Sequence, residues 1–138
     1  MTNRIVRALY GAKEVAYLPL VVTLVEEDRD GIGIAGPNWR FRINTTWRLV
    51  GAQDPSNVRL TSEDPGSVGT LREIVTGDEV VALELCRHEE FGDLKTVLRG
   101  GSAVEVVSDF PYGEWIFSIW RADDPGRMPV FDLSGPLG

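Results

Sequence analysis

The chain has few of the residues that build disulfides and metal centres. Its 138 residues include one cysteine, Cys86, and one histidine, His88. A lone cysteine cannot close an internal disulfide, so nothing in the sequence requires an oxidising compartment. Zinc sites with several histidine or cysteine ligands are excluded. Cys86 ends the apolar run VVALELC, so we expect a small buried side chain there. The catalytic alternative is a thiol–imidazole pair with His88, two positions later on the same strand face.

Long hydrophobic runs are also missing. No apolar stretch approaches the roughly 20 residues that a membrane-spanning helix needs. The opening segment MTNRIVRALYGAKEV has no long apolar core before a small-residue cleavage site, so it does not resemble a signal peptide. We therefore expect a cytoplasmic protein that does not associate with a membrane.

Positive charge is scarce and unevenly placed. The chain carries 14 Lys and Arg against 21 Asp and Glu, a net charge of −7. Residues 1–50 hold seven basic and five acidic residues, whereas residues 51–138 hold seven basic and sixteen acidic residues. An acidic surface repels phosphate backbones, which argues against nucleic-acid binding and favours a basic protein partner. Simple solubility is the alternative explanation of the charge.

The motifs that suggest chemistry each lack an essential part. Residues 31–36, GIGIAG, match G-x-G-x-x-G, but Pro37 and an alternating segment follow where a dinucleotide site needs a helix. The turn Asp28–Gly31 resembles part of a calcium loop, but no glutamate follows before Glu63 to act as the late bidentate ligand. No G-x-S-x-G elbow occurs. We expect no catalytic residues, no metal and no cofactor, and hence a non-enzymatic protein.

The pattern of alternation and breaks predicts an α+β fold that is mainly antiparallel β. WRFRI, residues 39–43, alternates cleanly, and helical spacing in 2–12 is repeated in 70–77 at an offset of 66 positions. We predict two pseudo-repeated helix–strand–strand–strand units packed as one domain over residues 1–138. The expected boundaries are unit one at 2–51, a Pro-rich connector at 52–69, unit two at 70–125 and a C-terminal strand at 129–133.

Two acidic turns and one aromatic turn are the candidate surfaces for a protein partner. Exposed carboxylates steer a basic partner, and aromatic rings at a Pro–Gly turn make contact area. The candidate residues are Glu26, Glu27, Asp28, Asp30, Glu89, Glu90, Asp93, Tyr112 and Trp115. Arg40 and Arg42 share a strand face and offer a competing anion-binding site, or they form ion pairs with acids of a neighbouring strand.

The segment from Phe91 to Ser118, FGDLKTVLRGGSAVEVVSDFPYGEWIFS, resembles a small, largely uncharacterised bacterial family that is frequent in actinobacteria. The residues that carry the resemblance are Leu94, Leu98, Gly100, Gly101, Val104, Val106, Tyr112 and Trp115. The similarity covers about residues 5–50 and 70–120, and the chain departs from the family in its 52–69 connector and in the segment 130–133. Small acidic members of such groups look like immunity proteins, so the resemblance implies a cytoplasmic protein that blocks a toxin by binding it.

The leading hypothesis is therefore an acidic binding protein of immunity type that neutralises a basic protein toxin. The alternative is a small-molecule-binding protein or enzyme with a pocket between the two β-rich halves. A third possibility is a structural homodimer that forms through an exposed strand edge.

Overall fold

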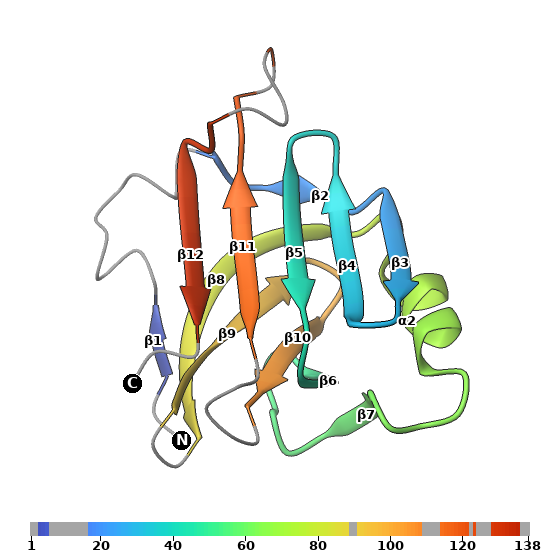
Figure 1. Ribbon diagram of the computed structural model, residues 1–138. Coiled ribbons are helices and arrows are strands. Elements are labelled where there is room, and N and C mark those ends of the chain that lie inside the picture. The colour runs from blue at the N-terminus through green and yellow to red at the C-terminus, as the bar shows by residue number, and fades with distance from the viewer. Residues whose placement is uncertain are drawn as a thin grey trace.

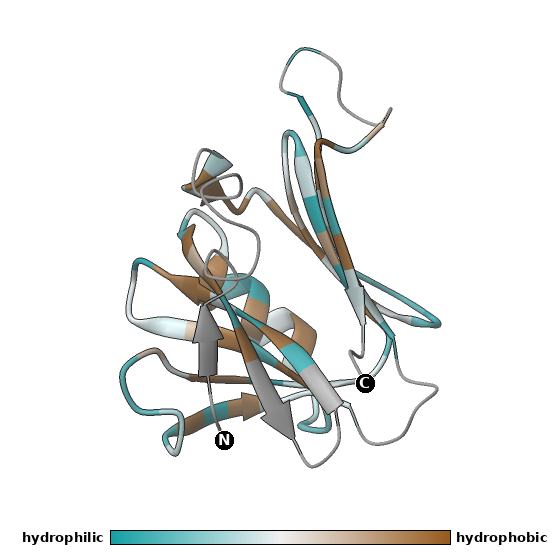
Figure 2. Ribbon diagram, turned by 90° about the vertical axis from the view of Figure 1, so that its left-hand side faces the viewer, coloured by the Kyte–Doolittle hydropathy of each residue, from teal (hydrophilic) through white to brown (hydrophobic). Residues whose placement is uncertain are grey.

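The computed structural model describes residues 3–5, 17–88, 91–108, 114–121, 123 and 128–135. For residues 3–5, 86–88, 91 and 92 the description extends to the backbone only. Within this part the chain forms two antiparallel sheets and the helix α2 (Ser67–Val75). Figure 1 shows the smaller sheet in front of the larger one, with α2 beside its edge, and Figure 2 shows the sheets as two layers.

The front sheet has five strands in the order β12-β11-β5-β4-β3. They are β12 (Phe131–Gly135), β11 (Trp115–Ile119), β5 (Trp39–Ile43), β4 (Gly31–Gly36) and β3 (Leu24–Asp28). The rear sheet has seven strands in the order β1-β8-β9-β10-β6-β7, and β2 also pairs with β8. They are β1 (Asn3–Ile5), β2 (Leu20–Val21), β6 (Thr46–Gly51), β7 (Val58–Thr61), β8 (Glu79–His88), β9 (Phe91–Leu98) and β10 (Ser102–Val107).

Each half of the chain builds a three-stranded meander in one sheet and sends its next strand to the other sheet. β3, β4 and β5 are neighbours in the five-stranded sheet, and the following strand β6 pairs with β10 in the seven-stranded sheet. Conversely, β8, β9 and β10 are neighbours in the seven-stranded sheet, and β11 pairs with β5 in the five-stranded sheet. Both sheets therefore contain strands from both halves.

The core between the sheets is rich in aromatic rings from β5 and β11. Alternation in WRFRI turns Trp39, Phe41 and Ile43 inward, where each is at most 2% exposed. The Phe41 ring meets Phe117 edge-on, with centroids 5.6 Å apart, and meets Trp115 at 6.3 Å. Full burial of each such side chain contributes about 1.5–3 kcal/mol, so this aromatic layer supplies a large part of the cohesion between the sheets.

Helix α2 packs against the edge strands β3 and β7, one from each sheet. Its buried face carries Leu71 and Val75, which are 0% and 1% exposed. The Arg72 Nε donates a hydrogen bond of 3.0 Å to the backbone oxygen of Val25 in β3. The helix thus covers the gap between these two edges and satisfies a polar group of an edge strand.

The predicted pair of helix–strand–strand–strand units is wrong. The first unit was expected to open with a helix over 2–12, but Asn3–Ile5 is a strand that pairs with Cys86, Leu85 and Glu84 of β8. The ten-residue β8 offers an edge whose backbone pairing outweighs a weak local helix signal. The two predicted units also do not form separate sheets, because each exchanges its fourth strand. The fold is better described as two antiparallel sheets with one helix in the described residues.

The predicted connector at 52–69 is not loop throughout. It contains β7, where Leu60 is buried, and the first residues of α2. The helix begins at Ser67, three residues before the expected start of unit two at 70, and Gly66 before it is in the left-handed region at φ 69°. The C-terminal strand expected at 129–133 lies at Phe131–Gly135.

Candidate functional site

The turn between β3 and β4 brings four of the candidate acids to one end of the molecule. Arg29 and Asp30 form the two turn residues. The Asp28 Oδ1 accepts hydrogen bonds from the backbone N–H groups of Asp30, at 2.9 Å, and Gly31, at 3.2 Å. A carboxylate that bonds to the backbone two and three positions later stabilises such a turn. The turn places Glu27, Asp28 and Asp30 in the lining of the pocket described below.

The outer face of β4 is flat because it presents only Gly31, Gly33 and Ala35, while Ile32 and Ile34 point into the core. Gly33 lies directly between Glu26 of β3 and Arg42 of β5 in the strand register. Long side chains from β5 can therefore cross β4 and reach β3. The repeated small residues of GIGIAG serve this crossing, which gives the glycine motif a structural role.

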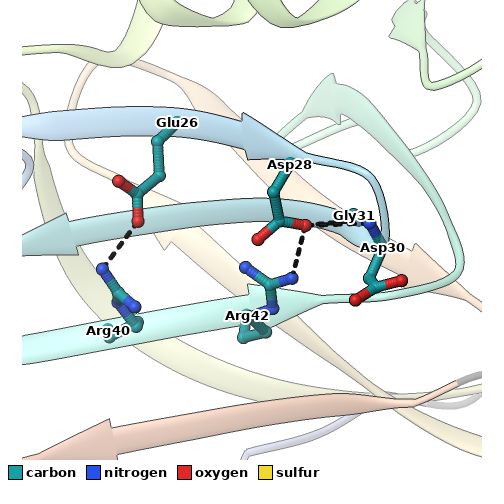
Figure 3. A network of polar contacts seen from close by, with 6 residues as sticks. All are labelled: Glu26, Asp28, Asp30, Gly31, Arg40 and Arg42. Atoms are coloured by element: carbon teal, nitrogen blue, oxygen red, sulfur yellow. Dashed lines mark hydrogen bonds and ion pairs between the residues drawn. The ribbon is translucent and has the colours of Figure 1, made fainter.

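Two ion pairs span this flat strand (Figure 3). The Arg40 Nη2 lies 2.7 Å from the Glu26 Oε2, and the Arg42 Nη2 lies 2.6 Å from the Asp28 Oδ1. Glu26 and Asp28 were expected to meet a basic partner, and Arg40 and Arg42 were expected to hold an anion. In the structure these two acids and two arginines neutralise one another. Ion pairing with acids of a neighbouring strand was one of the two interpretations of Arg40 and Arg42; the ion pairs are present, but the acids belong to β3, one strand beyond the neighbouring β4.

The Asp28 carboxyl is electrostatically the most perturbed group of this network. Its hydrogen bond with Arg42, followed by that with the Asp30 N–H, lowers its pKa from 3.8 to about 2. The same hydrogen bond raises the pKa of Arg42. Both shifts favour the charged forms, so the pair remains ionised down to strongly acidic pH. The Asp28 side chain is 51% exposed, and solvent screening keeps the energetic contribution of the pair small.

A pocket of about 400 Å³ opens where the β3–β4 turn, the crossing from β5 to β6 and the segment before α2 meet. Its apolar lining residues are Ile32, Ile43, Trp47 and Val68, each of which is at most 8% exposed. Its polar lining consists of Glu27, Asp28, Arg29, Asp30, Asn44, Thr45, Thr46, Ser62 and Ser67. The lining residues lie between positions 27 and 68, so this pocket does not lie between the two halves as the small-molecule alternative assumed.

Two of the predicted partner-binding residues are buried and serve the core. Asp93 was expected in an exposed acidic turn, but it lies in β9 and is 0% exposed. Its Oδ2 accepts the Ser108 backbone N–H at 2.9 Å, and its Oδ1 accepts the Ser108 Oγ at 2.6 Å and the Trp115 Nε1 at 3.1 Å. Trp115 is also 0% exposed. This network joins the two sheets, so both residues are withdrawn from the candidate partner surface.

The other predicted site residues lie partly outside the described residues. Glu89, Glu90 and Tyr112 are not described, and of Cys86 and His88 only the backbone in β8 is described. The thiol–imidazole alternative therefore stays a prediction. The candidate acids that do lie at the surface are those of the β3–β4 hairpin. Of these, the Glu27 and Asp30 side chains form no ion pair with a described residue.

Sequence reasoning missed a row of alternating charges across four strands of the seven-stranded sheet. Glu84, Lys95, Glu105 and Arg48 lie directly opposite one another on β8, β9, β10 and β6. The Lys95 Nζ is 3.4 Å from the Glu84 Oε1, and the Arg48 Nε is 2.7 Å from the Glu105 Oε1. The Lys95 side chain is 2% exposed and that of Glu105 is 4% exposed. Opposite charges in register stabilise strand pairing, and a slip would leave buried charges unpaired.

Two further features bear on function. Across the described ranges, no group of three or more His, Cys, Asp or Glu side chains is arranged to bind a metal ion. In the same part of the chain, no helix has both the length and the apolar character needed to cross a bilayer.

The chain was compared with known proteins in three ways. A scan against protein-family models, a search of curated proteins and a search of solved structures each find no match. The features that bear on function are therefore the acidic β3–β4 hairpin and its pocket.

Proposed function

We propose that this chain is a non-enzymatic binding protein that captures a basic protein partner at its acidic end. The acidic end is defined by Glu27, Asp28, Asp30, Glu63 and Asp64. The first three line the pocket, and the segment that carries Glu63 and Asp64 runs between the pocket residues Ser62 and Ser67. The observation that carries the proposal is the gathering of these exposed acids around the pocket, whose lining includes one cation, Arg29, among the described residues.

The electrostatics of the described surface favour this end over the outer face of the five-stranded sheet. On that face Glu26 and Asp28 are paired with Arg40 and Arg42, so little net charge remains. At the acidic end Glu27 and Asp30 have no such partners among the residues that the structure describes. Uncompensated surface charge accelerates the encounter with an oppositely charged protein. Neutralisation of a basic toxin, which the family resemblance implies, is one form of this function.

The test measures association at several ionic strengths. Affinity capture from cells of the native host first isolates the partner, and association rates are then measured for the purified pair. We expect a basic partner whose on-rate falls as salt is added, because screening removes the attraction of the exposed acids. A variant with Glu27→Gln, Asp30→Asn and Glu63→Gln should associate more slowly, with a shallower salt dependence. An on-rate that neither salt nor the variant changes would contradict the proposal.

A second candidate is a small-molecule-binding protein, and the pocket favours it. A volume of about 400 Å³ is within the range of known ligand sites, and the site combines an apolar floor with convergent polar groups. A small molecule that raises the melting temperature of the wild type, but not of a variant with Thr45→Trp at the pocket, would support this candidate.

Sedimentation at several protein concentrations separately tests the homodimer hypothesis.

A further inference from the structure

The pocket at the acidic end combines the two surfaces that a basic side chain needs. Its lining includes the apolar residues Ile32, Ile43, Trp47 and Val68, each at most 8% exposed, together with the acids Glu27, Asp28 and Asp30. Lysine and arginine bury an aliphatic stem against apolar surface and keep a cationic head near acceptors. The carboxylates are not gathered into a metal-binding group among the described residues. The lining therefore suits an extended organic cation.

Trp47 adds an independent feature to the lining of this pocket, a buried hydrogen-bond donor. It lines the pocket and is 3% exposed, yet its indole N–H has no acceptor among the described residues. The other two fully buried tryptophans are paired. The Trp39 Nε1 donates to the Val21 oxygen at 2.8 Å, and the Trp115 Nε1 donates to Asp93 at 3.1 Å. Buried indole donors normally find a partner, so the Trp47 N–H is available for an acceptor carried by a ligand.

We infer that the pocket receives a lysine or arginine side chain presented by the protein partner, and that a peptide carbonyl next to this side chain accepts the Trp47 indole N–H. The inference rests on the proposed function and adds the recognition element. The cationic head meets Asp30 and Glu27, whose carboxylates have no ion pair with a described residue. Asp28 is already held by Arg42 and contributes less. A ligand with both a cation and a carbonyl satisfies the two unpaired features of the site together.

The experiment follows the indole N–H signals of the intact chain by two-dimensional NMR. Four tryptophans give four indole signals, and Trp47→Phe assigns the one of interest. The probes are Nα-acetyl-arginine methylamide and Nα-acetyl-lysine methylamide. Nα-acetyl-norleucine methylamide keeps the stem and the carbonyls without the charge, and butylguanidinium keeps the charge without a carbonyl. We expect a saturable shift of the Trp47 signal with the basic amides and at least about tenfold weaker binding of both truncated probes.

Two exposed carboxylates provide matched variants. Glu27→Gln and Asp30→Asn should each weaken binding of the arginine amide by about two- to fivefold, the range of a solvent-screened ion pair. Glu73→Gln, on the exposed face of α2 and outside the pocket lining, should leave the affinity unchanged. Equal binding of the norleucine amide, tighter binding of Nα-acetyl-glutamate methylamide, or no shift of the Trp47 signal at the highest probe concentration would each overturn the inference.

The outcomes separate the pocket from the proposed function. If a basic protein partner associates with a salt-dependent on-rate that the triple variant lowers, but Trp47→Phe and Thr45→Trp leave its affinity unchanged, the proposed function stands and the pocket assignment is wrong. If the arginine amide binds but no basic protein does, the pocket is a site for small organic cations and the proposed function is wrong.

Discussion

Substitution of Asp93 by asparagine tests whether this carboxylate joins the two sheets. Asp93 accepts three hydrogen bonds with two oxygen atoms, from the Ser108 N–H, the Ser108 Oγ and the Trp115 Nε1. Asparagine has the same shape but replaces one oxygen with an amide that donates. Whichever way the amide turns, at least one buried donor loses its acceptor and faces another donor.

The expected loss follows from the number of donors left without an acceptor. A hydrogen bond to a charged group contributes about 1.5–3 kcal/mol, so Asp93→Asn should lower the free energy of unfolding by about 2 kcal/mol. Asp93→Ala leaves all three donors unpaired and should cost about 3–5 kcal/mol. Urea unfolding, followed by tryptophan fluorescence and by circular dichroism, gives both values if the two probes report a single transition.

Asp132→Asn is the matched control. Asp132 also accepts a serine hydroxyl at 2.6 Å, from Ser118, but its side chain is exposed on β12. Water can replace the lost acceptor there, so the change should cost less than about 1 kcal/mol. If Asp93→Asn is no more destabilising than this control, the carboxylate does not hold the sheets together and the reasoning fails.

Two further predictions concern the charged networks. The Asp28→Asn variant should lose less stability on acidification than the wild type. The lowered pKa of Asp28 contributes stability that is fully present above about pH 3.8 and is lost as the pH falls through about 2, and asparagine does not titrate. Melting temperatures at the two ends of this window measure the difference, and identical acid sensitivity would contradict the prediction. Lys95→Met keeps the aliphatic stem but removes the ion pair with Glu84, whereas Glu105 keeps its ion pair with Arg48. It should therefore cost about 1–3 kcal/mol in chemical denaturation, and a change below about 0.5 kcal/mol would show that the row of charges contributes little to stability.

The strands could be predicted from sequence because alternation reports burial of one face directly. WRFRI reads as β5, and its three inward residues are the buried ones. The turn after Asp28 was recognisable from its Asp–Gly ending. Alternation does not show which of the two sheets a strand joins, because a strand that buries one face has the same sequence pattern in either sheet. The exchange of β6 and β11 therefore could not be read from the sequence.

The candidate site was only partly predictable for a related reason. Glu27, Asp28 and Asp30 were identified as exposed acids, but the arginines that pair with Glu26 and Asp28 come from a strand two positions away in the sheet. Asp93 was misplaced because EEFGD has turn composition, whereas Phe91 to Leu98 continue as a strand under tertiary pairing. The pocket forms where chain segments converge, and no local pattern signals such a convergence.

The exchange of strands between the layers means that neither half of the polypeptide can complete a sheet by itself. Arg48 and Glu105, which meet across β6 and β10, are 57 positions apart, and Asn38 bonds to Trp120 across 82 positions. Such distant closures make folding slow and concerted, because early local hairpins gain little until the opposite half arrives. Two fragments cleaved near residue 54 should each remain unstructured and recover the native circular dichroism spectrum when mixed, which makes the chain a natural candidate for a split reporter of proximity.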